Sequence, residues 1–218
     1  MYVTSETTSN GVSERPFTHD GISGLLRPPV TRCSFAVAAI DAPGHGNRQR
    51  IEQDGQFAAG SKERMSAGEP IGPLVTRHNT SPAARAVPKW QSTPDALQDL
   101  DHVGASGRVG FWGVSLGSEI GVPSAAAEPR ITATDFGCAG HETLAEAAAQ
   151  VTVPVKSLLQ WDDEPVPRDV GLAFFDAFAS REKTLHTNPG RHAGIPAFGP
   201  ESSQRFFARH LVRDLDAP

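Results

Sequence analysis

Cysteine, long apolar runs and clusters of positive charge are all scarce in this sequence of 218 residues. Its two cysteines, Cys33 and Cys138, form neither a C-x-x-C pair nor a Cys/His spacing typical of zinc sites, so we expect reduced thiols. No stretch approaches the roughly 18 apolar residues that a membrane span needs. Lys and Arg number 20 against 25 Asp and Glu, with no long basic run. This balance argues against nucleic acid or an anionic membrane as a partner.

The amino terminus, "MYVTSETTSNGVSERPF", is polar and lacks the basic-then-apolar layout of a signal peptide, which predicts a cytoplasmic protein. A content of 38% hydrophobic and 21% charged residues is typical of one globular domain, which we expect over residues 1–218. Within it we expect an irregular amino-terminal segment over 1–33, with a short hairpin at most. We also expect an irregular excursion over the active face at 47–85, because no clear apolar period is found there.

Strands and helices alternate from about residue 34 onward. "SFAVAAID" (34–41) is a continuous apolar run, typical of a strand buried on both faces, and Thr93 with Pro94 indicates the start of a helix. Further strands are expected at 108–112 and in "RITATDF", "PVKSLLQWDD" and "KTLHT", and helices at 116–127, in "HETLAEAAAQ", at 167–180 and in "SSQRFFARHLV". This order predicts an α/β fold with a mostly parallel, doubly wound sheet and helices on both faces. Ligand sites in such sheets lie outside the carboxyl ends of the strands.

"GFWGVSLGS" (110–118) places one serine among three glycines, where a predicted strand ends and a predicted helix begins. Residues 113–117 match G-x-S-x-G, which is specific only in this strand-turn-helix context. Glycines permit a strained turn that holds Ser115 out, and the helix amino terminus directs N–H groups at negative charge forming nearby. The motif predicts a nucleophile. An ordinary loop with an incidental serine is the alternative.

A serine hydroxyl needs a base and an orienting acid, which follow this kind of turn in the order acid, then histidine. "WDDEPVP" ends one predicted strand and "NPGRHAG" follows the next, so Asp162 or Asp163, and His192, should lie at the same sheet edge as the serine. His186 lies inside a predicted strand and is expected to pack. Asp135, near the end of the preceding predicted strand, is a further position for the acid.

Four segments, "AAIDAPGHG", "VGFWGVSLGS", "LLQWDDEPVP" and "NPGRHAGIP", together resemble the α/β-hydrolase superfamily from about residue 35 onward. They are most similar to its bacterial dienelactone-hydrolase-like serine hydrolases. The resemblance implies Ser115 as nucleophile, His192 as base, and Asp163 as acid, since Asp163 stands four residues before the proline of a D-x-x-V-P stretch. It implies the backbone N–H of Leu116 as an oxyanion donor. It further implies hydrolysis of small-molecule esters through an acyl-enzyme, with no metal or organic cofactor; the oligomeric state stays open.

The front of the chain departs from this pattern. Members of the superfamily carry a strand, an oxyanion loop and a helix before the strand that "SFAVAAID" resembles, and here only "RPPVTRC" separates it from the turn-rich beginning. Strand 34–41 could pair with strand 108–112 and bring "APGHG" near Ser115 with a substitute N–H. Alternatively, the protein is a weak or inactive relative, a binding module or a truncated product. Lys156, in a strand expected to be buried, requires a partner.

Overall fold

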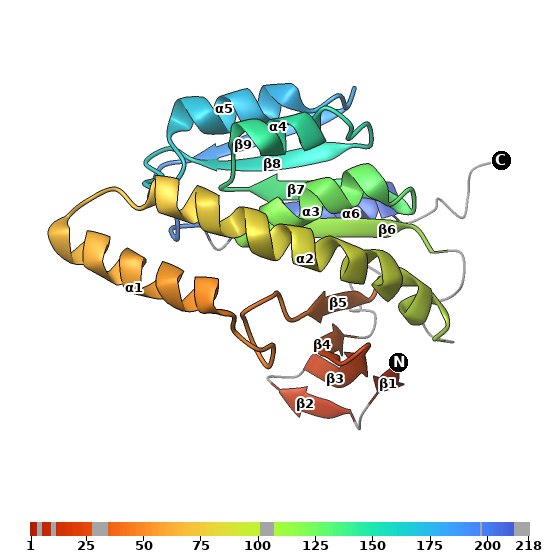
Figure 1. Cartoon of the computed structure of the whole chain (residues 1–218). Coiled ribbons are helices and arrows are strands. Elements are labelled where there is room, and N and C mark those ends of the chain that lie inside the picture. Colours follow the sequence, from red (N-terminus) through yellow and green to blue (C-terminus); the bar gives the residue numbers. More distant parts are fainter. Residues whose placement is uncertain (4–5, 10–11, 28–34, 101–106, 197, 212–218) are drawn as a thin grey trace.

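The computed structural model describes residues 1–3, 6–9, 12–27, 35–100, 107–196 and 198–211, and its strands form two sheets (Figure 1). The antiparallel sheet contains β1 (Tyr2–Val3), β2 (Thr7–Ser9), β3 (Val12–His19), β4 (Ile22–Arg27) and β5 (Val37–Ile40). The parallel sheet contains, in spatial order, β6 (Val109–Val114), β7 (Ile131–Gly137), β8 (Val155–Gln160) and β9 (Lys183–Asn188). The helices are α1 (Glu52–Ala67), α2 (Gly72–Gln98), α3 (Leu116–Ala127), α4 (Glu142–Ala148), α5 (Arg168–Ala177) and α6 (Gly199–Leu211).

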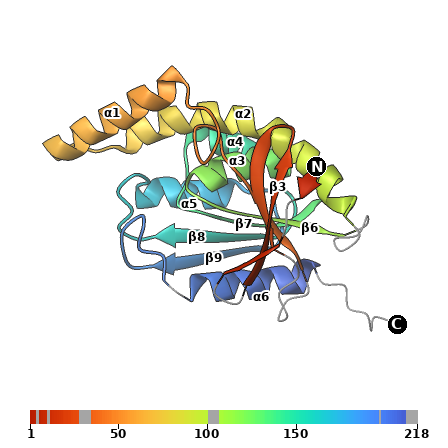
Figure 2. The same ribbon diagram turned by 90° about the horizontal axis from the view of Figure 1, so that it is seen from below.

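Helices cover both faces of the parallel sheet. Alternate side chains of a strand point to opposite faces. Phe111 of β6 and Phe136 of β7 pack toward α3, where a Cβ on Gly121 would lie 2.5 and 2.6 Å from their rings. On the other face, a Cβ on Gly110 would lie 2.7 Å from Phe207 of α6. Figure 2 shows α6 on the side of the sheet opposite α3, α4 and α5. The predicted parallel sheet with two helical layers is confirmed.

The amino-terminal segment is not irregular, which corrects the expectation for residues 1–33. Over its described residues it forms β1 to β4, and β3 and β4 make a hairpin in which His19 faces Ile22 across a two-residue turn. The turn residues Asp20 and Gly21 have φ angles of 49° and 74°, the left-handed values that such tight hairpins require. Phe17, at 2% exposure, anchors one face of the hairpin.

Residues 47–85 are not an irregular excursion either, because α1 and the first half of α2 lie in this range. The Asp54 carboxylate accepts the Ile51 N–H at 2.8 Å at the start of α1, and Gly68 ends it in the left-handed conformation. Asp54 is the one buried residue of α1, so no apolar face marks the helix in the sequence. Thr93 does not begin a helix: it lies inside α2, and its hydroxyl donates to the Lys89 carbonyl at 2.7 Å.

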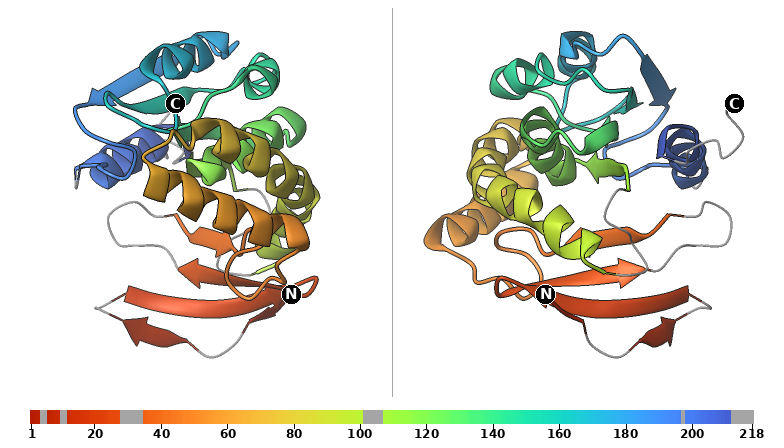
Figure 3. Two further views of the ribbon diagram at one scale, coloured as in Figure 1. Left: turned by 60° about the vertical axis from the view of Figure 1, so that its left-hand side comes forward. Right: turned by 90° about the vertical axis from the view of Figure 1, so that its right-hand side faces the viewer.

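The run at 34–41 contributes β5, which pairs with β4 and not with β6. β5 is also not buried on both faces, since Val37 is 46% exposed. The antiparallel partner next to it in the chain satisfies its backbone groups, so the pairing with strand 108–112, one of the two outcomes that the sequence left open, does not occur. β6 therefore lies at the edge of the parallel sheet, and the amino-terminal strands form a layer of their own beneath it (Figure 3).

Lys156 finds its partner on the neighbouring strand. The β7–β8 register places Asp135 directly beside Lys156, and the ammonium donates to the carboxylate at 3.0 Å and to the Ser203 hydroxyl of α6 at 3.3 Å. Asp135 and Lys156 are 2% and 3% exposed. Burial raises the pKa of Asp135, and the nearby ammonium opposes that rise. Asp135 and Lys156 therefore form a buried ion pair that faces α6. Asp135 is the partner that Lys156 requires, and it does not serve as the acid for His192.

Candidate active site

Ser115 occupies the turn between β6 and α3, as the glycine motif predicts. Its φ of 55° is one that a residue with a side chain rarely adopts, and its N–H donates to the Gly137 carbonyl at 2.8 Å. A Cβ at Gly113 would lie 2.3 Å from the Gly117 carbonyl oxygen, so only glycine fits there. A Cβ at Gly117 would meet nothing within 4 Å, so lack of space requires glycine at position 113 but not at position 117.

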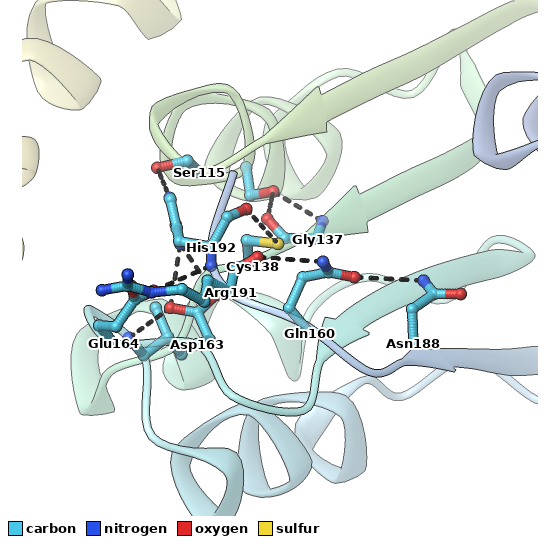
Figure 4. A network of polar contacts seen from close by, with 11 residues as sticks. Ser115, Gly137, Cys138, Gln160, Asp163, Glu164, Asn188, Arg191 and His192 are labelled. Carbon is cyan, nitrogen blue, oxygen red and sulfur yellow. Dashed lines mark hydrogen bonds and ion pairs between the residues drawn. The ribbon is translucent and has the colours of Figure 1, made fainter. Parts of the chain in front are cut away.

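The three residues predicted to act together do meet (Figure 4). Ser115 Oγ lies 3.0 Å from His192 Nε2, and His192 Nδ1 lies 2.8 Å from Asp163 Oδ2 and 3.0 Å from Asp163 Oδ1. The Asp163 carboxylate is fully enclosed, whereas a quarter of the His192 side chain is exposed. These contacts join an enclosed acid, an imidazole and a half-buried hydroxyl in one line.

Asp163, and neither of the other acids considered, contacts the imidazole. Its Oδ1 also accepts the Val166 N–H at 2.9 Å, which fixes the carboxylate. Asp162 points elsewhere: its side chain is 64% exposed, and its backbone N–H donates to the Gly190 carbonyl at 3.0 Å. In the turn that follows β8, the two adjacent acids thus differ: Asp163 points inward and Asp162 outward.

Two residues that the sequence did not single out, Glu164 and Gln160, form hydrogen bonds with the loop that carries His192. The Glu164 carboxylate accepts the His192 N–H at 3.0 Å and pairs with Arg191. The Gln160 amide, fully buried at the end of β8, donates to the Arg191 carbonyl at 3.1 Å and accepts from the Asn188 side chain at 3.2 Å. Their position beside the predicted acid was visible in the sequence, but their partners were not.

The electrostatics of the site favour a charged imidazole. The hydrogen bond that His192 Nδ1–H donates to the Asp163 carboxylate is the main cause that raises the pKa of His192, and burial opposes the rise. Because Nδ1 faces the carboxylate, the neutral ring carries its proton there and leaves Nε2 free to accept the Ser115 proton. His186, by contrast, lies in β9 beside Lys156, away from the serine, and burial lowers its pKa.

The predicted oxyanion donor, the N–H of Leu116, lies in the first turn of α3, where helix geometry provides no intrahelical acceptor. The "APGHG" loop is closed on itself, with the His45 N–H donating to the Ala42 carbonyl at 2.9 Å. Ala42, at the beginning of this loop, packs against the same extended apolar cluster as Leu116. Whether it supplies a second N–H stays a prediction.

One group of side chains among the described residues could hold a metal ion, namely Cys138, Asp163 and His192. Burial and the charge of Asp163 raise the pKa of the Cys138 thiol to about 12, so the thiol keeps its proton. Cys138 was noted in the sequence only for its lack of a zinc spacing. Its place beside the acid follows from the strand order, which brings the ends of β7 and β8 together.

Comparison with known proteins finds no matching protein-family model and no curated protein of similar sequence. Solved structures are similar. A cold-adapted esterase from an Arctic intertidal metagenomic library is 24% identical, over 97% of this chain and 100% of that chain, with a TM-score of 0.74. Acetyl xylan esterase 1 from Thermoanaerobacterium sp. JW/SL YS485 is 14% identical over 95% and 87%, with a TM-score of 0.64. A CIB-like hydrolase from Thermoplasma acidophilum is 16% identical over 91% and 96%, with a TM-score of 0.53. Together with the strand-turn-helix arrangement of the site, these similarities show that the chain has the fold of the α/β-hydrolase superfamily.

Proposed function

We propose that the protein is a serine hydrolase that cleaves small carboxylic esters through Ser115, His192 and Asp163. The observation that carries the proposal is the unbroken line of contacts from Ser115 Oγ to His192 Nε2 at 3.0 Å and from His192 Nδ1 to Asp163 Oδ2 at 2.8 Å. The fold supports the class of reaction, since similar structures are described as esterases and hydrolases. In the described part of the chain, no helix is long and apolar enough to cross a bilayer.

The first half of the reaction forms an acyl-enzyme. His192 Nε2 takes the Ser115 proton while Oγ attacks the ester carbonyl carbon, and Asp163 stabilises the imidazolium that results. The Leu116 N–H, together with the amino-terminal end of α3, stabilises the negative oxygen of the tetrahedral intermediate. The imidazolium then gives its proton to the departing alkoxide, which leaves as the alcohol.

In the second half, water replaces the alcohol. His192 takes a proton from the water as it attacks the acyl carbon, and returns that proton to Ser115 when the carboxylic acid departs. Every proton in this cycle moves between water, substrate and the chain's own side chains.

The substrate side of the site is bordered by the start of α2. A Cβ at Gly72 would lie 2.6 Å from the Pro165 carbonyl, so this helix end packs directly on the loop that carries Asp163. The α1–α2 hairpin, which projects from the body in Figure 1, thus begins its second helix beside the site. We propose that this hairpin limits the size of the ester.

A second candidate function is that of a weak or inactive relative. It is favoured by the edge position of β6, since the superfamily strand that usually brings a second oxyanion donor is not paired with it. Loss of one such donor costs about 2.7–4 kcal/mol, or roughly 10²–10³ in rate.

Hydrolysis of p-nitrophenyl acetate tests the proposal. Wild type and Ser66→Ala, a matched change at an exposed serine of α1, should turn over alike, and Ser115→Ala should show no turnover above background. Equal rates for Ser115→Ala and wild type would overturn the proposal. Turnover that is lost in Ser115→Ala but roughly 10²–10³ below that of ordinary esterases would favour the second candidate.

A further inference from the structure

The Cys138 thiol lies against the acid and the histidine, a position that the proposed hydrolysis does not use. One ligand atom from each of Cys138, Asp163 and His192 lies within 4.8 Å of the other two. Cys138 and Asp163 are 3% and 8% exposed, so these donors face one another inside the protein and not solvent. A thiolate, a carboxylate and an imidazole are the ligand types that Zn²⁺ selects.

We propose that this group is an inhibitory site for a thiophilic divalent cation such as Zn²⁺, with Cys138 Sγ, Asp163 and His192 Nδ1 as ligands. Zinc bonds of about 2.0–2.3 Å in a tetrahedron set ligand atoms roughly 3.3–3.7 Å apart. His192 Nδ1 and Asp163 Oδ2, now 2.8 Å apart, must separate by about half an ångström. Cys138 Sγ must approach the other two ligand atoms by no more than about 1.1–1.5 Å.

The ion replaces protons and transfers no electrons. It takes the lone pair of His192 Nδ1, and the proton formerly on Nδ1 moves through solvent to Nε2. The Cys138 thiol releases its proton to solvent, since a coordinating thiol is bound as the thiolate. One thiolate and one carboxylate balance the double positive charge, and the fourth position is open to water.

Such an ion blocks hydrolysis without contact with Ser115. Once Nε2 carries a proton, it donates toward Ser115 Oγ and cannot accept the hydroxyl proton that attack requires. Inhibition therefore rests on the proposed function, whereas binding of the ion does not. The two statements can fail separately.

Cobalt binding tests the site directly, because Co²⁺ bound to a thiolate gives a charge-transfer band in the near ultraviolet. Co²⁺ is titrated into wild type, Cys138→Ser, Cys138→Ala and Cys33→Ser, the last being the matched control at the chain's other cysteine. Wild type and Cys33→Ser should bind one Co²⁺ per chain with this band, and Zn²⁺ should abolish it. Both Cys138 variants should lack the band, and circular dichroism checks that they are folded.

Inhibition is then measured with p-nitrophenyl acetate. The Zn²⁺ concentration for half-inhibition should rise tenfold or more in whichever Cys138 variant is folded and active, because even the loss of a group that only orients a ligand costs about 10–100-fold in metal affinity. EDTA should restore the wild-type rate. Absence of the cobalt band in wild type, its persistence in a Cys138 variant, or equal zinc sensitivity of Cys138 and Cys33 variants would overturn the inference. If metal-free wild type shows no turnover, the proposed function fails and the cobalt band still decides the site.

Discussion

Replacement of Gln160 by leucine should separate the positioning of His192 from the chemistry that His192 performs. Gln160 is fully buried, and its amide holds the Arg191 carbonyl at 3.1 Å and the Asn188 side chain at 3.2 Å. Leucine has a similar volume but no polar atoms. It leaves the Arg191 carbonyl and the Asn188 side-chain amide without these partners. Arg191 directly precedes His192 in the chain.

The magnitude follows from these two contacts. Each lost hydrogen bond costs about 0.5–1.5 kcal/mol, and each buried group left unpaired raises that toward 1–3 kcal/mol, so the free energy of unfolding should fall by about 2–6 kcal/mol. Displacement of the imidazole by about 1 Å can cost roughly 10² in rate. We expect kcat to fall by about 10–10²-fold with little change in KM, because the amide does not face the substrate.

The assay combines urea unfolding with steady-state hydrolysis of p-nitrophenyl acetate. Gln150→Leu, the same change at an exposed position after α4, is the matched control and should alter stability by less than about 0.5 kcal/mol. An unchanged kcat in Gln160→Leu, alongside the predicted loss of stability, would show that this amide supports the fold but does not position His192. An unchanged stability would refute the network itself.

Three further perturbations have defined outcomes. Asp163→Asn should lower kcat by about 10⁴, as loss of the orienting carboxylate does in serine triads, whereas Asp162→Asn should stay within a few-fold of wild type in the same ester assay. Because Asp163 raises the pKa of His192, activity should fall as pH drops through that raised pKa, and a kcat–pH profile of Asp163→Asn should show the fall at lower pH. The raised pKa of His192 also stabilises the folded protein. This stabilisation is fully present below the pKa of about 6.5 that histidine has in the unfolded chain, and it is lost as the pH rises through the folded-state pKa. Urea unfolding at several pH values across that range measures it. Lys156→Met should cost about 3–5 kcal/mol in urea unfolding by leaving Asp135 buried and unpaired, and the double variant with Asp135→Leu should recover most of it.

The positions of the proposed triad could be predicted from the sequence because each follows a strand of one parallel sheet. Ser115 directly follows β6, Asp163 comes three residues after the end of β8, and His192 comes four residues after the end of β9. Parallel strands bring their carboxyl ends to one edge. The alternation of strands and helices in the sequence was enough to predict the sheet edge that they share. Distances of 3.0 and 2.8 Å between them required the structure.

What the sequence did not predict depends on contacts between distant segments. α1 buries a single polar residue, Asp54, so no apolar period distinguishes it from a loop. β5 is apolar enough for a central strand, yet it joins the adjacent hairpin, because pairing with β4 satisfies its backbone hydrogen-bonding groups. The partners of Gln160 and Cys138 likewise arise only when the ends of neighbouring strands come together.

Covalent labelling with a fluorophosphonate is the measurement that bears most directly on an activated hydroxyl at residue 115. We expect one adduct per chain, located on the peptide that contains Ser115, with no adduct in Ser115→Ala and strongly slowed labelling in His192→Ala. A folded wild-type protein that takes up no label, or that carries the label on another serine, would contradict it.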